Sequence, residues 1–138
     1  MDHRERTVES AMQREVVSVR ADERLDLVDD IMKLGAVRHM PVLEGERLVG
    51  VISQRDLLAA SLSKVLEFEG KQRRTFMRSV AVGEVMTRSP VVIAPSATLR
   101  EAARLLLERR FGCLPVVDAQ GHMVCLLTET DLMRAAYA

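Results

Sequence analysis

Two stretches of the chain carry apolar residues at the three- and four-residue spacing of an amphipathic helix. Thr98 and Glu101 form a capping-box pattern at the start of the second stretch, with Ser96 or Asp22 as alternative caps. We therefore predict two helices, each with one face in a hydrophobic core. The apolar positions are Leu25, Val28, Ile31 and Met32, and then Leu99, Ala102, Ala103 and Leu106.

Short apolar segments typical of strands flank each predicted helix. One precedes the helix, and two follow it as a pair joined by a polar turn that contains glycine. A further helix begins near Asp56 and near Asp131. The predicted order is strand, helix, strand, strand, helix, and it occurs twice. The strands are Val16–Val19, Met40–Leu43 and Leu48–Ile52, then Val91–Ile93, Leu114–Val117 and Met123–Leu127, and the turns are Glu44–Arg47 and Asp118–His122.

These two sets of elements are copies of one another. An offset of 74 places Pro41 on Pro115, and after one inserted residue an offset of 75 places Leu48–Leu58 on Met123–Met133. Because the matches recur in order with a single insertion, we interpret them as an internal duplication. A unit of this size buries too little apolar surface to be stable alone. We expect an α/β (α+β) fold in which the copies pack sheet against sheet, with two related clefts.

The repeats are predicted at residues 8–60 and 82–137, with a helical and basic linker at 61–81. The linker holds the one basic cluster of the sequence: Lys71, Arg73, Arg74 and Arg78. Such a run is typically solvated. The alternatives are docking of an acidic partner or of a nucleotide phosphate.

Composition excludes several classes of function. The 138 residues include 20 Lys and Arg against 20 Asp and Glu, a balance that disfavours a nucleic-acid-coating protein. The 3% aromatic content without tryptophan disfavours a base-stacking platform. No apolar run reaches the roughly 18 residues of a membrane helix, and the charged N-terminus differs from a signal peptide. We expect a cytoplasmic protein.

Catalytic and metal-binding motifs are absent from the sequence. It contains no Walker loop, GxGxxG or HExxH motif. The three histidines and two cysteines have no metal-ligand spacing. Cys113 has no sequence-evident histidine partner beyond His122, so we interpret it and Cys125 as packing residues. We expect no enzyme activity, no metal and no prosthetic group.

The segments LVGVISQRDLL and MVCLLTETDLM, which follow the Pro-Val strands RHMPV and GCLPV, resemble a tandem pair of CBS domains. This family is named for the regulatory region of cystathionine beta-synthase, and the pair is called a Bateman module. The resemblance covers roughly residues 8–60 and 82–137. It implies a βαββα fold, frequent dimerisation, and binding of AMP, ADP, ATP or S-adenosylmethionine.

The family's ligand motif is Ser or Thr, two further residues and Asp, between the last strand and the last helix. It matches Ser53–Asp56 and Thr128–Asp131. The resemblance implies that Asp56 and Asp131 bind ribose, since a carboxylate can accept both hydroxyls. Ser53 and Thr128 would lie against phosphate beside the unpaired amides of a helix start. The same pattern is also an ordinary capping box, and both roles are compatible.

In related nucleotide-binding copies, basic residues before the Pro-Val strand reach the phosphates. Arg38 and His39 match those positions, and together with Arg55 they form a predicted phosphate clamp. The alternatives are a partly buried, hydrogen-bonded His39 and a surface salt bridge for Arg38. The second copy has Gly112, Cys113 and Thr130 instead, so we expect its cleft to be weaker.

An adenine ring needs an apolar slot. Most of the candidates would be core residues whether or not a ligand binds. They are Val17, Ser18, Val19 and Met40 in the first copy, and Val91, Val92, Ile93 and Leu114 in the second.

The favoured hypothesis is a stand-alone regulatory module that binds an adenosine nucleotide, forms a homodimer and signals to a partner protein by population shift. The alternative is a dimerisation or docking module with vestigial clefts and no ligand. Nucleic-acid binding through residues 71–78 is disfavoured by the balanced charge.

Overall fold

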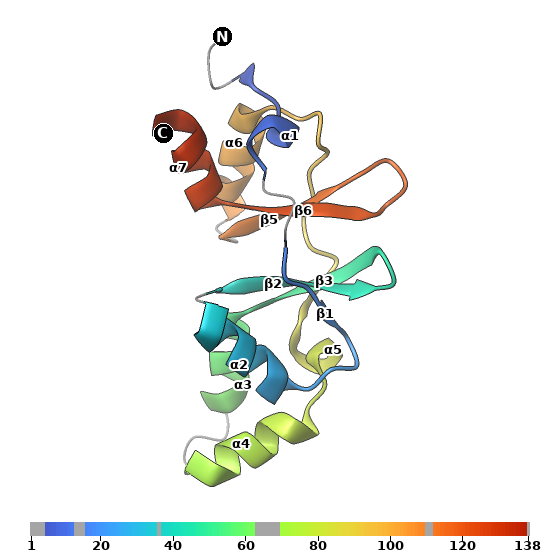
Figure 1. Cartoon of the computed structure of the whole chain (residues 1–138), viewed down its shortest axis with the longest axis vertical. Coiled ribbons are helices and arrows are strands. Elements are labelled where there is room, and N and C mark those ends of the chain that lie inside the picture. The colour runs from blue at the N-terminus through green and yellow to red at the C-terminus, as the bar shows by residue number, and fades with distance from the viewer. Residues whose placement is uncertain (1–4, 13–15, 36, 63–69, 110–111, 138) are drawn as a thin grey trace. The chain divides into compact units, whose positions relative to one another are not determined.

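The computed structural model describes residues 5–12, 16–35, 37–62, 70–109 and 112–137 (Figure 1). The chain forms two compact units. The first-repeat unit comprises residues 17–45 and 49–89, and the second-repeat unit comprises the described residues within 1–16, 46–48 and 90–138. The segment that opens each repeat belongs to the other repeat's unit, and residues 46–48 of the first repeat also belong to the second-repeat unit, so neither unit is contiguous.

The first-repeat unit is built on a four-stranded sheet in the order β1-β2-β3-β4. Strand β1 is parallel to β2, with Val19 opposite Val42, and β4 is antiparallel to β3. Its strands are β1 (Val19–Arg20), β2 (His39–Glu44), β3 (Arg47–Ser53) and β4 (Thr87–Arg88), and its helices are α2 (Leu25–Gly35), α3 (Gln54–Leu62), α4 (Gly70–Ser79) and α5 (Val82–Val85).

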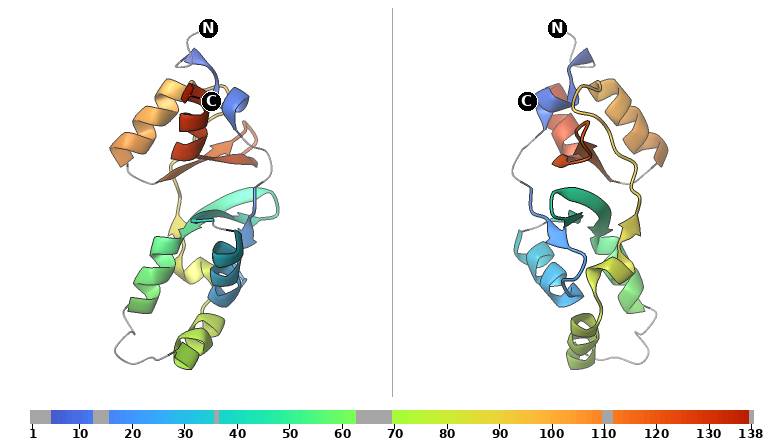
Figure 2. Two further views of the ribbon diagram at one scale, coloured as in Figure 1. Left: turned by 60° about the vertical axis from the view of Figure 1, so that its left-hand side comes forward. Right: turned by 90° about the vertical axis from the view of Figure 1, so that its right-hand side faces the viewer.

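The second-repeat unit contains the antiparallel pair β5 (Cys113–Val117) and β6 (Met123–Thr128), with Leu114 opposite Leu127. Its helices are α1 (Val8–Ala11), α6 (Leu99–Arg109) and α7 (Glu129–Tyr137). Helix α1 lies beside α7 (Figures 1 and 2).

Each unit has its own hydrophobic core, and the predicted helical stripes supply part of it. Leu25, Val28 and Met32 of α2 are buried in one core, and Leu99, Ala102 and Leu106 of α6 in the other. The α6 cap is also as predicted, since the Glu101 N–H donates a 3.1 Å hydrogen bond to Thr98 Oγ1. The helices and hairpins predicted from the sequence are therefore confirmed.

The strand predicted at Val91–Ile93 is wrong. Only Ile93 forms an isolated parallel bridge, to Val116. Pro95 follows two residues later and has no N–H with which to continue the ladder. In the first repeat the strand begins at Val19, at the end of the predicted Val16–Val19 segment.

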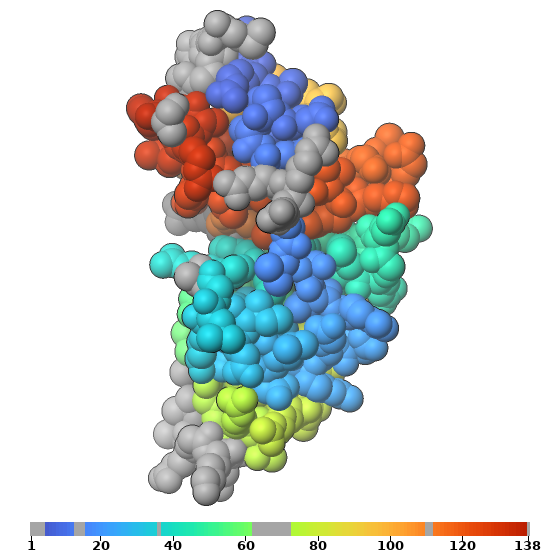
Figure 3. Space-filling model, in the orientation of Figure 1, coloured from blue at the N-terminus to red at the C-terminus, as the bar shows by residue number. Residues whose placement is uncertain are grey.

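The basic segment differs from a solvated linker. It folds as α4, which packs against α2 within the first-repeat unit (Figures 2 and 3). Met77 is 2% exposed and belongs to the core of this unit. Three arginines of α4 pair with aspartates of α2, whereas the side chain of Lys71 lies outside the described residues. The pairs are Arg73–Asp29 at 3.9 Å, Arg74–Asp30 at 3.3 Å and Arg78–Asp26 at 3.6 Å.

Candidate functional site

In the first-repeat unit, the predicted ligand motif lies at the junction of β3 and α3. The Ser53 N–H donates a 2.8 Å hydrogen bond to Asp56 Oδ2, and the Asp56 N–H donates a 3.0 Å bond to Ser53 Oγ. This reciprocal pair is a capping box, which satisfies backbone amides at the start of the helix. The capping interpretation of the motif is therefore confirmed.

The second-repeat unit has the same box with more contacts to its carboxylate. Asp131 Oδ2 accepts hydrogen bonds from the Thr128 N–H at 2.8 Å and from the Thr128 hydroxyl at 3.0 Å. The other oxygen, Oδ1, accepts a 3.4 Å bond from Arg134 Nη1 on the next turn of α7. Asp131 is only 7% exposed. Both oxygens of a buried carboxylate are thus engaged within the protein.

The two motifs differ at carboxylate oxygen Oδ1, which takes no part in the capping box. No residue in the described parts of the chain pairs with Asp56 Oδ1. The position that matches Arg134 is Ala59, which cannot donate a side-chain hydrogen bond. Asp56 is also half-buried rather than buried. Asp56 therefore retains an oxygen that can accept from a ligand hydroxyl, whereas Asp131 would first have to give up Arg134.

The predicted phosphate-binding segment lies next to the first motif. The Gln54 N–H, at the start of α3, donates a 2.8 Å hydrogen bond to the Arg38 carbonyl. Arg38 and Arg55 are exposed, and His39 is half-buried. Neither arginine has an ion-pair partner among the described residues, so the salt bridge considered for Arg38 is not observed there. Two cations that have no acidic partner in the described parts of the chain therefore flank the start of α3.

The corresponding segment of the second-repeat unit has no such cations. Cys113 is 3% exposed and lies opposite Thr128 in the β5–β6 pair. Gly112, which matches Arg38, has a φ of 78°, in the left-handed region that favours glycine. Thr130 is exposed and uncharged. The start of α7 is therefore less suited to an anion than the start of α3.

Comparison with known proteins decides the family. The CBS domain model matches residues 8–63 and 82–138. The chain belongs to the CBS domain family.

Two relatives illustrate the similarity of this CBS pair to known proteins. CBSX2, a chloroplastic CBS domain-containing protein of Arabidopsis thaliana, is 36% identical over 130 residues, which cover 79% of this chain and 55% of CBSX2. A CBS domain-containing protein of Dictyostelium discoideum is 28% identical over 127 residues, which cover 91% of this chain and 88% of that protein. The crystal structure of CBSX2 in complex with AMP matches with a TM-score of 0.80 and 34% identity, covering 94% of this chain and 95% of that one.

Some relatives are much longer than this CBS pair. The chain spans about half of CBSX2. It spans 23% of an inosine-5'-monophosphate dehydrogenase from Korarchaeum cryptofilum, with 26% identity over 124 residues. In these relatives, the region that is similar to this chain is only one part of a longer protein.

The candidate adenine residues of the CBS pair fall into two groups. Val19, Met40, Ile93 and Leu114 are at most 7% exposed and lie in the two cores. The other four have surface that a ligand can reach: Val17 is 50% exposed, Val92 is 44% exposed, Ser18 is exposed and Val91 is half-buried. The adenine slot remains a prediction, and Val17, Ser18 and Val92 are its most accessible members.

Sequence reasoning missed the contact that distinguishes the two motifs. Asp131 and Arg134 are three residues apart on one helix, a spacing at which opposite charges meet. That spacing was a usable signal. The described residues contain no group of three or more His, Cys, Asp and Glu side chains that could hold a metal ion. No helix within the described ranges is long and apolar enough to cross a membrane.

Proposed function

We propose that this CBS pair is a regulatory module that binds an adenosine nucleotide, with its principal contacts in the first-repeat unit. The candidates are AMP, ADP, ATP and S-adenosylmethionine. The observation that carries the assignment is the carboxylate oxygen of Asp56 that has no partner in the described residues. The AMP complex of its relative CBSX2 supports the class of ligand.

Each side chain has a role that its chemistry suits. Asp56 accepts hydrogen bonds from the ribose hydroxyls, which are strengthened by its negative charge. Arg38 and Arg55, with His39, bind the phosphates, and the planar guanidinium can donate two parallel hydrogen bonds to one phosphate. Ser53 holds the start of α3 in place through the capping box.

The second motif is proposed as a weaker site. Thr128 and Asp131 have the same box, but Asp131 Oδ1 is engaged by Arg134. The guanidinium at position 134 competes with a ribose hydroxyl for that oxygen. A less anionic adenosine ligand suits this site, since no cation replaces Arg38 or Arg55.

The proposed consequence of binding is regulation of a partner protein. A ligand shifts a conformational equilibrium only by its difference in affinity for the two states. We propose that the module acts in the cytoplasm as a homodimer, and that it carries no catalytic activity of its own. A homodimer without any nucleotide site is the competing proposal.

A thermal-shift and calorimetric panel of AMP, ADP, ATP and S-adenosylmethionine tests this function. A ligand at one hundred times its Kd adds about 2.7 kcal/mol to the stability of the folded state. For a domain of this size we expect the midpoint to rise by about 10 °C. No rise with any of the four compounds would overturn the nucleotide assignment and favour the competing proposal.

The matched pair Asp56→Asn and Asp131→Asn tests which motif is the principal site. Loss of charge-assisted hydrogen bonds of about 1.5–3 kcal/mol predicts at least about tenfold weaker binding for Asp56→Asn. Asp131→Asn should leave the Kd of the tighter nucleotide-binding site nearly unchanged. Ligand-free melting of both variants separates loss of binding from loss of the capping box. Equal losses of affinity would contradict the assignment to the first-repeat unit.

A further inference from the structure

The turn of the first-repeat hairpin is attached to the hairpin of the second repeat. Residues 46–48 belong to the second-repeat unit. The Met123 N–H donates a 3.2 Å hydrogen bond to the Glu46 carbonyl, and Arg47 forms an isolated antiparallel bridge with His122. Glu46 Oε2 also lies 3.6 Å from His122 Nδ1. We call this set of contacts the hairpin junction.

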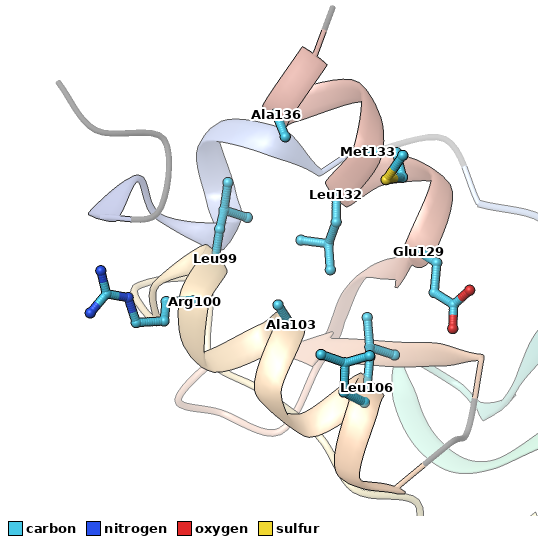
Figure 4. Close-up of a pocket in the computed structure, with 9 residues that line it drawn as sticks. Leu99, Arg100, Ala103, Leu106, Glu129, Leu132, Met133 and Ala136 are labelled. Carbon is cyan, nitrogen blue, oxygen red and sulfur yellow. The ribbon is translucent and has the colours of Figure 1, made fainter.

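The hairpin junction lies at the start of two strands that each end at a ligand motif. Strand β3 runs from Arg47 at the junction to Ser53 of the first capping box. Strand β6 runs from Met123 at the junction to Thr128 of the second box, and it leads directly into α7, which begins at Glu129 (Figure 4). At about 3.3 Å per residue, roughly 17–20 Å of strand separates the junction from each motif. One strand from each motif therefore leads to the same backbone contact.

The packing of both strands prevents them from absorbing a displacement at one end. On β3, Gly50 pairs with β4, and Ile52 is fully buried in the core of the first-repeat unit. On β6, Leu127 is fully buried and lies opposite Leu114. Sliding either strand by one residue would move its buried side chains to the other face of the sheet. A restraint on the end of each strand therefore reaches its start.

The hairpin junction is the weakest contact on this path. Arg47 forms a single bridge rather than a ladder, and the side chains of Glu46 and His122 are 80% and 44% exposed. Exposed pairs of this kind contribute about 0–1 kcal/mol. A contact of this strength opens locally far more often than the two cores unfold. Nucleotide binding can therefore shift the equilibrium between its closed and open states.

We propose that the hairpin junction couples the two nucleotide motifs, so that a nucleotide bound at Asp56 keeps the junction closed and favours binding at Asp131. Coupling of this kind rests on the proposed function, since it requires nucleotide at both motifs. The first ligand bears the entropic cost of ordering the junction, and the second ligand then binds without that cost. By linkage, the second nucleotide tightens binding of the first by the same factor. The result is positive cooperativity between two unequal sites.

Amide hydrogen exchange of the full chain, measured by NMR, follows opening of the junction. The Met123 N–H is the reporter, because its acceptor is the Glu46 carbonyl. The Gly121 N–H is the control, since it donates a 3.1 Å hydrogen bond to the Asp118 carbonyl within one turn. We expect saturating AMP to slow exchange at Met123 at least about fivefold more than at Gly121. Asp56→Asn should abolish this difference at AMP concentrations that saturate the parent protein.

A matched pair of charge changes in one hairpin tests whether the junction carries the coupling. Glu46→Lys replaces the carboxylate beside His122 with a cation, so it should speed exchange at Met123 about two- to fivefold. It should also raise the Kd of the second AMP binding event by a similar factor in titration calorimetry. Glu44→Lys is the control, because Glu44 is exposed at the end of β2 and takes no part in the junction. It makes the same change of charge and should alter neither quantity, and thermal melts of both variants confirm folding.

Two results would overturn the coupling and leave the proposed function intact. One is AMP binding that does not slow exchange at Met123 more than at Gly121. The other is equal behaviour of Glu46→Lys and Glu44→Lys in both measurements. Absence of AMP binding would overturn the coupling together with the proposed function.

Discussion

The attachment of α4 to α2 should depend on its apolar side chain rather than on its ion pairs. Met77 is 2% exposed and lies in the first-repeat core, so Met77→Ala leaves a cavity among well-packed neighbours. Such truncations cost about 2–5 kcal/mol. At about 4 °C per kcal/mol for a domain of this size, the midpoint should fall by roughly 8–20 °C.

The three ion pairs should contribute much less. The side chains of Arg73, Arg74 and Arg78 are 42%, 53% and 63% exposed, and only the Arg74–Asp30 pair is also a hydrogen bond. Exposed pairs are worth about 0–1 kcal/mol each and are screened by salt. Changing all three arginines to glutamine should therefore cost about 1 kcal/mol in total.

Urea unfolding of both variants at low and high salt measures the two contributions. Limited trypsin digestion adds a local readout, because cleavage in α4 requires the helix to detach from α2. Met77→Ala should be cut faster at Arg73, Arg74 and Arg78 than the parent protein. A triple-glutamine variant that loses more stability than Met77→Ala would refute the reasoning, and so would a Met77→Ala cost below about 1 kcal/mol.

Two further changes test the site and the sheet. Ala59→Arg gives the first repeat the counterpart of Arg134, the arginine that engages Asp131 in the second repeat. The new arginine should compete for Asp56 Oδ1 and raise the Kd of AMP about two- to fivefold in titration calorimetry, without lowering the ligand-free melting midpoint. Gly50→Ala should lower the free energy of unfolding, measured in urea, by about 2 kcal/mol, because the added Cβ would lie 2.8 Å from the Thr87 carbonyl oxygen on β4. An unchanged free energy of unfolding would show that β4 can move aside.

The sequence predicted the parts of the fold that local patterns encode. In α2, α6 and the hairpin strands, the spacing of apolar residues follows the geometry of the backbone, so it can be read from the sequence. The duplication supplied each of these predictions twice. The loss of the strand expected at Val91–Ile93 was not predictable in the same way. Parallel pairing depends on a distant partner, and here Pro95 leaves only the single bridge between Ile93 and Val116.

The role of α4 was missed because charge patterning describes one helix at a time. Asp26, Asp29 and Asp30 lie on one face of α2, and that spacing is equally typical of a solvated surface. Only the packing of two helices shows that this face meets Arg73 and its neighbours. The spacing of the ligand motif was enough to find it in the sequence. Whether its carboxylate can accept from a ligand depends on the residue one turn further along the helix, which is Ala59 in the first repeat and Arg134 in the second.

The second motif gives a prediction of its own. Asp131 caps α7, and its Oδ1 is engaged by Arg134 on the next turn. Arg134→Ala should free this oxygen to accept a hydrogen bond from a ligand hydroxyl, so we expect the weaker of two AMP binding events to tighten about two- to fivefold in titration calorimetry. An unchanged Kd for that event would show that the contact with Arg134 does not limit binding at the second motif.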